Sequence, residues 1–395
     1  MNYSEQQRIL SLLKTGIESG ESARLDRIVK APVSDFTCTD LLEREKQTFF
    51  RDTPLLLGMS ADLPENGSYL ATNETGVPIL MTRGDDGEFR AFLNVCRHRG
   101  VQVVAGGRGR RGRFTCPFHA WTYRNSGELI AVNHEDKFGC IDKGDRGLVA
   151  LPAAEHHGML WVKPTVGGDI DPDALLGGLG DEMESWNLPE NPYSEHQVLD
   201  ADINWKLAID TFGENYHFDV LHKDSLAPEI HGNLQTSDIF DRNYRMVFAT
   251  RLGFKYVEDN KMPQAEWPYR FITLNVYFLY PNVILLVDGS GVDLLRMYPD
   301  PVDPGKSKTW HTSYTHPLAL KGQEEARARG EEVESRLVGF NRIVVDEDYM
   351  MAAGTQRGAS SGAQTHYLFG QNEPALHHYH NMHRAGLGLP PLEAA

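Results

Sequence analysis

The chain has 395 residues and a mass of 44.4 kDa, a length that corresponds to two or three domains. Apolar residues make up 41% and charged residues 24%, which is typical of a soluble globular protein and excludes wholesale disorder. The 39 Lys and Arg residues are outnumbered by 55 Asp and Glu residues, and the resulting net charge of −16 argues against nucleic acid or an anionic membrane as the main partner.

No apolar run of the sequence reaches the 18 residues of a membrane helix, because Asn275, Pro281 and Asn282 interrupt the nearest candidate, residues 271–288. The first residues have too short an apolar core for a signal peptide. We therefore expect a cytoplasmic protein without a membrane segment. Its four cysteines are too few for a disulfide scaffold in a chain of this size.

The first half of the chain predicts three segments. Residues 1–45 begin with apolar residues at helical spacing, and we expect this segment to pack on the C-terminal domain. Residues 46–165 contain short apolar runs separated by Gly-rich turns, a pattern that predicts an all-β domain. Residues 166–200 are rich in Gly, Asp and Pro near their start and are expected to form a linker.

The remaining residues, 201–395, predict a domain that mixes helices with antiparallel strands. A helix pattern near 205–217 precedes runs that read as successive strands. One long helix is expected over 319–353 and a last helix over 373–386. The predicted fold class is therefore α+β, with an all-β domain followed by an antiparallel sheet flanked by helices.

Two short segments of the predicted all-β domain combine cysteine with histidine, as C-x-H over residues 96–98 and C-x-x-H over residues 116–119. Two thiolates and two imidazoles suit zinc, but zinc sites usually pair like ligands within a segment. One ligand of each type per segment favours a two-iron cluster, with both cysteines on one iron and both histidines on the other. The alternatives are a zinc site and metal-free Cys/His pairs in the core. The residues concerned are Cys96, His98, Cys116 and His119.

A second candidate site lies near residue 217. His217 and His222 are five residues apart, about 140° on a regular helix, so the helix must end or bulge between them to bring both to one point. Two histidines and one carboxylate with open positions describe a mononuclear Fe(II) site for oxygen chemistry. The acidic residues 346–348 of the late helical stretch are candidates for the carboxylate. The alternative is a pair of hydrogen-bonded core histidines.

The segments FLNVCRHRG and FTCPFHAWTY resemble the Rieske proteins, and GENYHFDVLH with the late acidic segment resembles the Rieske non-haem iron oxygenases, the large subunits of ring-hydroxylating and demethylating enzymes. This resemblance implies a helix-grip catalytic domain. It also implies that Asp348, with Asp346 as the fallback, joins His217 and His222 on the iron. Glu214 would be the acidic bridge between cluster and iron; the aromatic dioxygenases usually carry aspartate there, whereas demethylases and quaternary-ammonium oxygenases carry glutamate.

The resemblance also implies the cofactors and partners. We expect one Rieske [2Fe-2S] cluster and one Fe(II) per chain, O2 as co-substrate, and NAD(P)H acting only through a reductase. A ferredoxin or flavin reductase would supply electrons, and a small beta subunit is a further possible partner. The family forms head-to-tail trimers in which His119 of one subunit would contact Glu214 of the next.

The expected activity is O2-dependent ring hydroxylation of an organic, aromatic substrate. The alternatives are oxidative demethylation or monooxygenation of a methoxy, methylamino or quaternary-ammonium substrate, a pure electron carrier without an iron site, and a zinc-stabilised binding protein. Six arginines between residues 97 and 113 invert the local charge and suggest a dock for an acidic electron donor, or a solvated loop without a partner. Six aromatic residues are candidates for the substrate pocket or for plain core: Phe271, Tyr277, Phe278, Tyr280, Trp310 and Tyr314.

Overall fold

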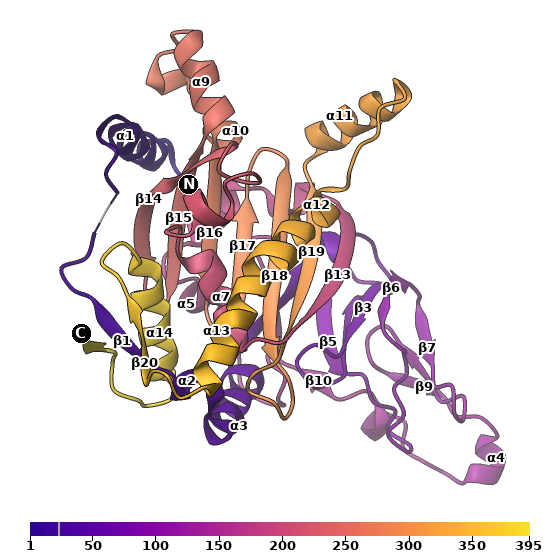
Figure 1. The fold of residues 1–395 in the computed structure, drawn as a ribbon. Helices are drawn as coiled ribbons and strands as arrows, with labels where there is room; N and C mark the ends of the chain where they lie inside the picture. Colours follow the sequence, from indigo (N-terminus) through magenta and orange to yellow (C-terminus); the bar gives the residue numbers. More distant parts are fainter. Residues whose placement is uncertain (23) are drawn as a thin grey trace. The chain divides into compact units, whose positions relative to one another are not determined.

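The computed structural model describes residues 1–22 and 24–395 and divides the chain into two units (Figure 1). One unit is Gln47–Pro172, and the other combines Met1–Lys46 with Asp173–Ala395. The N-terminal segment thus belongs to the same unit as the C-terminal half. The residues expected to form a linker carry two short helices and most of a strand, namely α5 (Pro172–Leu176), α6 (Gly180–Ser185) and β13 (Tyr193–Ala201).

The unit Gln47–Pro172 is built from short antiparallel strands, as the spacing of turns and apolar runs predicts. They form three sheets with the orders β10-β5-β4-β3-β6, β11-β12-β2 and β7-β8-β9. The helical turns are η1 (Thr48–Asp52), η2 (Ser60–Asp62), α4 (Glu135–Phe138) and η3 (Gly144–Arg146). The strands are β2 (Leu55–Met59), β3 (Ser68–Thr72), β4 (Ile79–Arg83), β5 (Phe89–Leu93), β6 (Gly107–Arg110), β7 (Arg113–Thr115), β8 (Thr122–Arg124), β9 (Leu129–Ala131), β10 (Ala150–Leu151), β11 (Ala153–His156) and β12 (Met159–Val162).

The other unit is organised around a seven-stranded antiparallel sheet with the order β13-β19-β18-β17-β16-β15-β14. Its central strand β17 is buried along its whole length, because both faces of the sheet are covered. A second, three-stranded sheet has the order β20-β1-β21. The remaining strands are β1 (Val29–Pro32), β14 (Ile230–Phe240), β15 (Asn243–Thr250), β16 (Thr273–Leu279), β17 (Val283–Val287), β18 (Gly291–Pro299), β19 (Ser307–Thr315), β20 (His366–Phe369) and β21 (Glu393–Ala394).

Helices cover both faces of the seven-stranded sheet (Figure 1). α7 packs against β17–β19 and α14 packs against β14 and β15, while α1 reaches the same two strands from the other side, where Arg245 bonds Glu5. The α+β prediction is confirmed. The helices and helical turns are α1 (Tyr3–Ser19), α2 (Ser34–Thr37), α3 (Thr39–Gln47), η4 (Leu188–Glu190), α7 (Trp205–Gly213), α8 (Phe218–Leu221), α9 (Arg251–Asp259), η5 (Gln264–Glu266), α10 (Tyr269–Ile272), α11 (Pro317–Ala328), α12 (Arg336–Ile343), η6 (Val344–Tyr349), α13 (Met350–Ser360) and α14 (Pro374–Gly386).

The late helical stretch differs from the single helix that the sequence predicts over 319–353. α11 ends before Gly330, which has φ +80°, a left-handed conformation that glycine adopts without strain. α12 restarts after Ser335, whose side chain accepts a hydrogen bond from the backbone N–H of Val338. α12 then widens into the π-helical turn η6 before continuing as α13. Such turns are frequent at functional sites.

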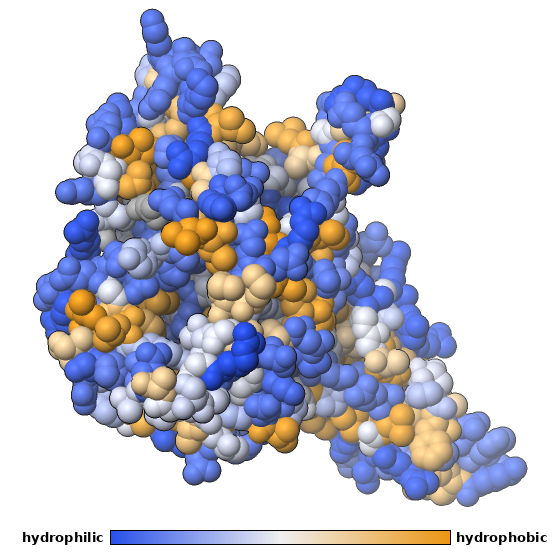
Figure 2. Space-filling view, in the orientation of Figure 1, coloured by the Kyte–Doolittle hydropathy of each residue, from blue (hydrophilic) through white to orange (hydrophobic). Residues whose placement is uncertain are grey.

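On the face shown in Figure 2, hydrophilic residues cover most of the surface and apolar residues form separate patches. Among the helices that the structure describes, none combines the length and the apolar character needed to cross a membrane.

Candidate metal centres

Two loops of the unit Gln47–Pro172 fold in the same way around a cysteine. The backbone N–H of Gly100 donates to the carbonyl of Cys96, and that of Ala120 donates to the carbonyl of Cys116. Gly100 and Ala120 both have a positive φ, +80° and +57°, so each loop turns back sharply after its cysteine. The N–H of each cysteine is in turn bonded across the loop, to Val101 in the first and to Trp121 in the second. The sequence spacing thus corresponds to two matching turns.

The four predicted ligands lie at the tips of these loops. Both cysteines are buried in the apolar core, and burial raises the pKa of the Cys116 thiol. The His98 and His119 rings have centroids 4.6 Å apart, and His98 stacks on Trp121 at 5.0 Å.

The donor set fits a two-iron cluster better than zinc. His98 Nδ1 is buried and has no hydrogen-bond partner among the described residues, as expected of a nitrogen reserved for a metal. No three of the four ligand atoms lie within 4.8 Å of one another. Ligands of one zinc ion, at about 2.0–2.3 Å from the metal, would converge more closely, whereas two irons need a wider cage.

Tyr123 supports the first of these loops. Its hydroxyl lies 3.3 Å from Cys96 Sγ and accepts a hydrogen bond of 3.0 Å from the backbone N–H of Arg97. With its oxygen occupied by that N–H, the hydroxyl proton is free to point at the sulfur. Burial raises the pKa of Tyr123, so the group remains a donor over the physiological range.

In the other unit, a helix ends before His217, so the five-residue spacing of His217 and His222 does not fall on one regular helix. α7 stops at Gly213, where a Cβ would lie 2.7 Å from a Leu376 methyl group. His217 and His222 then flank the single turn of α8. Their Nε2 atoms lie 3.1 Å apart, so the two rings do face one point, as the prediction of a broken helix requires.

Asp348 completes the cluster from the π-helical turn η6. Its Oδ1 lies 3.4 Å from His217 Nε2 and 3.2 Å from His222 Nε2. Ligand atoms about 2.1 Å from one ion and at right angles to each other lie about 3 Å apart, so this triangle has the size of a 2-His-1-carboxylate site. Asp346, the fallback, is exposed on the same turn and is not among these three converging ligands.

Each of the two histidines has a carboxylate within hydrogen-bond distance of its Nδ1 atom. Glu214 Oε1 lies 2.5 Å from His217 Nδ1, and Glu347 Oε2 lies 2.7 Å from His222 Nδ1. Burial alone would lower the pKa of His217, but Asp348 and Glu214 outweigh it and raise the pKa to about 9. For His222, Asp348 and Glu347 likewise outweigh burial and raise its pKa. The site is therefore strongly anionic and suits a cation.

Among the acidic residues 346–348, the sequence reasoning missed that Glu347 bonds His222. It also accepts a 2.8 Å hydrogen bond from the Ser225 hydroxyl, which fixes the carboxylate beside His222. The only signal was its place next to Asp348, and adjacent residues on a regular helix point about 100° apart. The π-helical turn brings both carboxylates to the two histidines.

A cavity of 670 Å³ opens beside this cluster, and Glu214, His222 and Asp348 line it. Five phenylalanines form much of its wall, namely Phe212, Phe218, Phe248, Phe271 and Phe340. Of the six aromatic residues considered from the sequence, Phe271 is the one among the lining residues; Tyr277, Phe278, Tyr280 and Tyr314 are buried elsewhere in the core. The volume lies within the usual range for small-molecule sites.

The charged groups of this cavity are largely paired with each other. Arg336 bonds Asp288 at 2.9 Å, and Arg342 bonds Glu334 at 2.7 Å. The cavity thus presents an apolar wall with few free charges, apart from the exposed Glu229.

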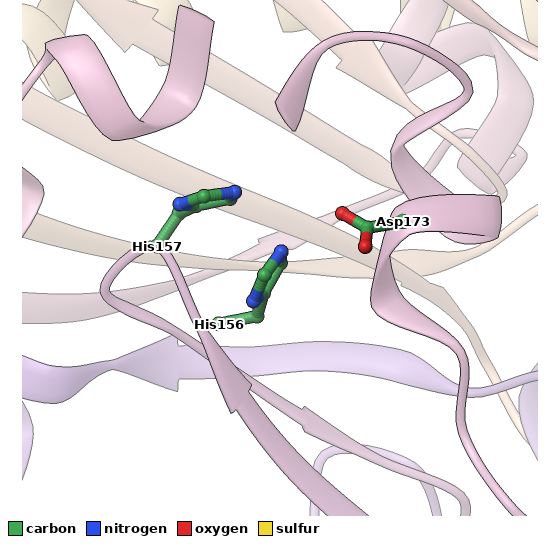
Figure 3. Close-up of side chains that lie close together, drawn as sticks. All are labelled: His156, His157 and Asp173. Atoms are coloured by element: carbon green, nitrogen blue, oxygen red, sulfur yellow. The ribbon is translucent and has the colours of Figure 1, made fainter. Parts of the chain in front are cut away.

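A further pair of histidines lies in the unit Gln47–Pro172. His156 ends β11, and His157 occupies the turn to β12 with φ +49°. Their ring centroids are 3.8 Å apart (Figure 3). Asp173, also labelled in Figure 3, belongs to the other unit, and we assign no common site to the three residues.

A chain with matched Cys/His loops and a 2-His-1-carboxylate cluster has the two centres of an iron-dependent oxygenase component. Residues 190–388 match the model of the ring hydroxylating alpha subunit (catalytic domain), and residues 53–148 match that of the Rieske [2Fe-2S] domain. The chain therefore belongs to the family of ring hydroxylating alpha subunits. A [2Fe-2S] cluster and a mononuclear iron are the cofactors of this family, as predicted.

The relatives fall into two chemical groups. The chain is 28% identical over 188 residues to the carnitine monooxygenase oxygenase subunit of Acinetobacter baumannii, covering 47% of this chain and 51% of that one. It is 25% identical over 391 residues to the alpha subunit of toluate 1,2-dioxygenase of Pseudomonas putida, covering 86% and 83%. The matches span 40–51% of the length of the first three curated relatives.

Among solved structures, a quaternary ammonium Rieske monooxygenase in complex with L-carnitine superposes with a TM-score of 0.73 at 18% identity. The superposition covers 91% of this chain and 96% of that chain. This likeness shows the fold over the 91% of the chain that superposes.

Proposed function

We propose that the protein is the terminal oxygenase component of a Rieske system, which passes electrons from its cluster to a mononuclear iron and oxidises an organic substrate with O2. The observation that carries this proposal is the convergence of His217 Nε2, His222 Nε2 and Asp348 Oδ1 beside a 670 Å³ cavity. An electron carrier would need neither the triangle of ligands nor the cavity.

The residue roles follow from the donor types. Cys96 and Cys116 hold one iron of the cluster, and His98 and His119 hold the other. His217, His222 and Asp348 hold the ferrous ion, which supplies the open coordination positions for oxygen chemistry.

Glu214 and Glu347 act through the histidines. Each carboxylate lies within hydrogen-bond distance of an Nδ1 atom and accepts a hydrogen bond from its N–H, which leaves the Nε2 lone pair directed at the ion. Glu214 is also suited to the bridge between centres. In a head-to-tail trimer, His119 of one subunit would reach the Glu214 of its neighbour, and a separate reductase or ferredoxin would supply the cluster.

The cavity supports a substrate with an apolar body. Its phenylalanine rings offer faces to an arene, and the two guanidinium groups in its wall are already paired, so they would not attract a carboxylate. We therefore propose hydroxylation of a neutral aromatic substrate.

A second candidate is monooxygenation of a quaternary-ammonium substrate. Aromatic faces also bind organic cations. Among the charged lining residues that the structure describes, Glu229 is the one without an ion pair, and Glu214 stands where such oxygenases carry glutamate.

Substrate-dependent O2 consumption tests both candidates. The reduced protein would be screened with naphthalene, anisole, benzoate, carnitine and glycine betaine, with product analysis. The proposal predicts turnover of the neutral arenes, or of the quaternary amines for the second candidate, and none of benzoate. Leu286→Trp, which fills the cavity, should abolish turnover, whereas Leu318→Trp on the exposed helix α11 should not. O2 consumption that no compound stimulates would favour the electron carrier.

A further inference from the structure

A small enclosed void lies beside the catalytic cavity, in the same unit of the chain. It is bounded by the helices α7 and α14 and by the strands β15, β16 and β17 of the seven-stranded sheet. Its volume of 10 Å³ is at the lower limit of the space, about 10–15 Å³, that holds one water-sized molecule. Most of its wall is apolar and includes Ile209, Met246, Phe278, Ile284 and Ala375. The void therefore has the size and the lining for one small apolar molecule.

The void lies between the catalytic cavity and the surface. On the inner side, Phe212 and Val276 line both the void and the 670 Å³ cavity. On the outer side, Tyr244 lines both the void and a 390 Å³ pocket whose wall includes the exposed Ile239. One layer of side chains therefore separates the void from each of the two larger spaces.

The polar groups of the void are too few for a well-held water molecule. Among the described lining residues, the polar side chains are Tyr244 and Tyr379. The Tyr244 hydroxyl interacts with Ser237, whereas the buried Tyr379 hydroxyl has no hydrogen-bond partner among the described residues. A buried water usually makes about three hydrogen bonds, which is more than these two hydroxyls offer. Dioxygen is apolar and requires none.

A second entrance would matter when the large cavity is occupied. A ligand in a cavity of this kind has most of its surface buried, so a bound organic substrate obstructs the way from the cavity mouth to the metal site. A path through the void avoids that mouth. At its inner end, Phe212 stacks on Phe340 with the ring centroids 6.3 Å apart, and a movement of the Phe212 side chain joins the two spaces without any change in the backbone.

We propose that this void, called here the dioxygen pocket, binds O2 on its way from the surface to the catalytic cavity. Tyr244 forms the outer gate of the path, and Phe212 with Val276 forms the inner gate. The inference rests on the proposed function, because it assumes that O2 is consumed at the metal site of the cavity. The organic substrate enters by the mouth of the large cavity, and O2 enters by the smaller path.

Crystals pressurised with krypton test the binding site without any turnover. Krypton is apolar and similar in size to O2, and its anomalous scattering locates it. We expect a krypton peak in the dioxygen pocket of the wild type. Ala375→Val, which fills the pocket from its wall, should lose the peak. The matched control is Ala359→Val, at a buried alanine of α13 outside the pocket, and should keep it. An ordered water in the wild type that krypton does not displace would overturn the proposal.

Steady-state kinetics with varied O2 test the path. In Ala375→Val we expect kcat/KM for O2 to fall about tenfold, because entry then requires the wall to move. The value of kcat/KM for the organic substrate should stay within about twofold of the wild type, because Ala375 does not line the large cavity. Ala359→Val should match the wild type in both values. Unchanged O2 kinetics in Ala375→Val would show that O2 enters by another way and would overturn the path.

Two further arms separate the possible failures. If Ala375→Val does not fold, Ile284→Val replaces it, since removing one methyl group enlarges the pocket and is a mild change in a core. This variant should raise both the krypton occupancy and kcat/KM for O2, and no change in either would overturn the proposal. If no organic compound supports turnover, the proposed function fails, and the krypton peak alone decides whether the pocket binds a small apolar molecule.

Discussion

The two candidate centres use imidazole side chains in opposite ways. In the Rieske unit, His98 is flanked by Trp121 and Phe138, its Nδ1 has no partner among the described residues, and burial lowers its pKa. In the catalytic unit, His217 and His222 each hold a carboxylate, and the pKa of both is raised.

This difference shows how the same type of ligand serves two different iron centres. Neutral imidazoles in an apolar setting leave the negative charge of the cluster to its thiolates, which raises its potential relative to an all-cysteine cluster. Around the mononuclear site, Glu214, Glu347 and Asp348 supply charge for a divalent ion that has no thiolate ligands. A substitution in one of these environments is expected to leave the other intact.

The largest effect is expected from Glu214→Gln, which removes the carboxylate that bonds His217 Nδ1. Fe(II) affinity should weaken as for any carboxylate behind a metal-bound histidine, but with Fe(II) in excess both metals should be bound. At that full occupancy turnover should still fall at least about a hundredfold, since the bridge between the centres is lost. Metal analysis with O2-consumption kinetics checks this. Asp219→Asn, in the same segment, is the matched control. Full activity of the Glu214 variant would exclude Glu214 from the electron route.

Glu347→Gln should weaken Fe(II) binding about 10–100-fold, the usual effect of losing a carboxylate behind a metal-bound histidine. This expectation rests on the distance of 2.7 Å between Glu347 Oε2 and His222 Nδ1. Fe(II) titration of the iron-depleted site measures it, with the exposed Asp346→Asn as control. The visible spectrum of the cluster should not change. Equal Fe(II) affinities of the two variants would show that Glu347 is not needed for iron binding.

Replacing Glu373 in the catalytic unit is expected to change the free energy of unfolding by an amount that depends on pH. Burial, with the nearby Glu214 and Asp210, raises its pKa to about 7 from an ordinary 4.5. A raised carboxyl pKa means that folding favours the protonated form, so its contribution to the free energy of unfolding falls as pH rises from about 4.5 to 7. At pH 8 the free energy of unfolding of Glu373→Gln should therefore be about 2 kcal/mol higher than that of the wild type.

Urea unfolding of both proteins in the same metal state measures this difference, which should nearly vanish at pH 4.5. A difference that does not depend on pH would show that Glu373 is ionised in the folded protein.

The smallest effect is expected from Tyr123→Phe in the Rieske unit. Removing the hydroxyl from Cys96 Sγ leaves more electron density on the sulfur and should lower the cluster potential. A hydrogen bond of about 1–1.5 kcal/mol corresponds to about 40–60 mV for one electron. Protein-film voltammetry measures the shift, and Tyr69→Phe in the same core is the control. An unchanged potential would mean that the hydroxyl does not donate to the sulfur.

Much of the fold was predictable from the sequence because its signals are local. The strand β17 and the last helix α14 lie where a continuous apolar run and a Glu-Pro start place them. The cluster ligands could also be predicted from a local pattern, since each loop carries a Cys and a His within four residues.

The catalytic site was harder, because its geometry depends on departures from regular helix. Sequence spacing indicated that the helix must break between His217 and His222, but not that it ends at Gly213. The π-helical turn that presents Asp348 and Glu347 together has no periodic signal in the sequence. The partners Ser225 and Glu347 are 122 residues apart in the chain, so no local pattern relates them.

The central claim is that one chain carries a two-iron cluster and a separate mononuclear iron. Iron and acid-labile sulfide should be measured per chain in the anaerobically reconstituted wild type and in Asp348→Asn and Asp346→Asn. We predict about three irons and two sulfides in the wild type and in Asp346→Asn, and two irons with two sulfides in Asp348→Asn. Two irons in the wild type, or an iron content that Asp348→Asn does not change, would contradict the claim.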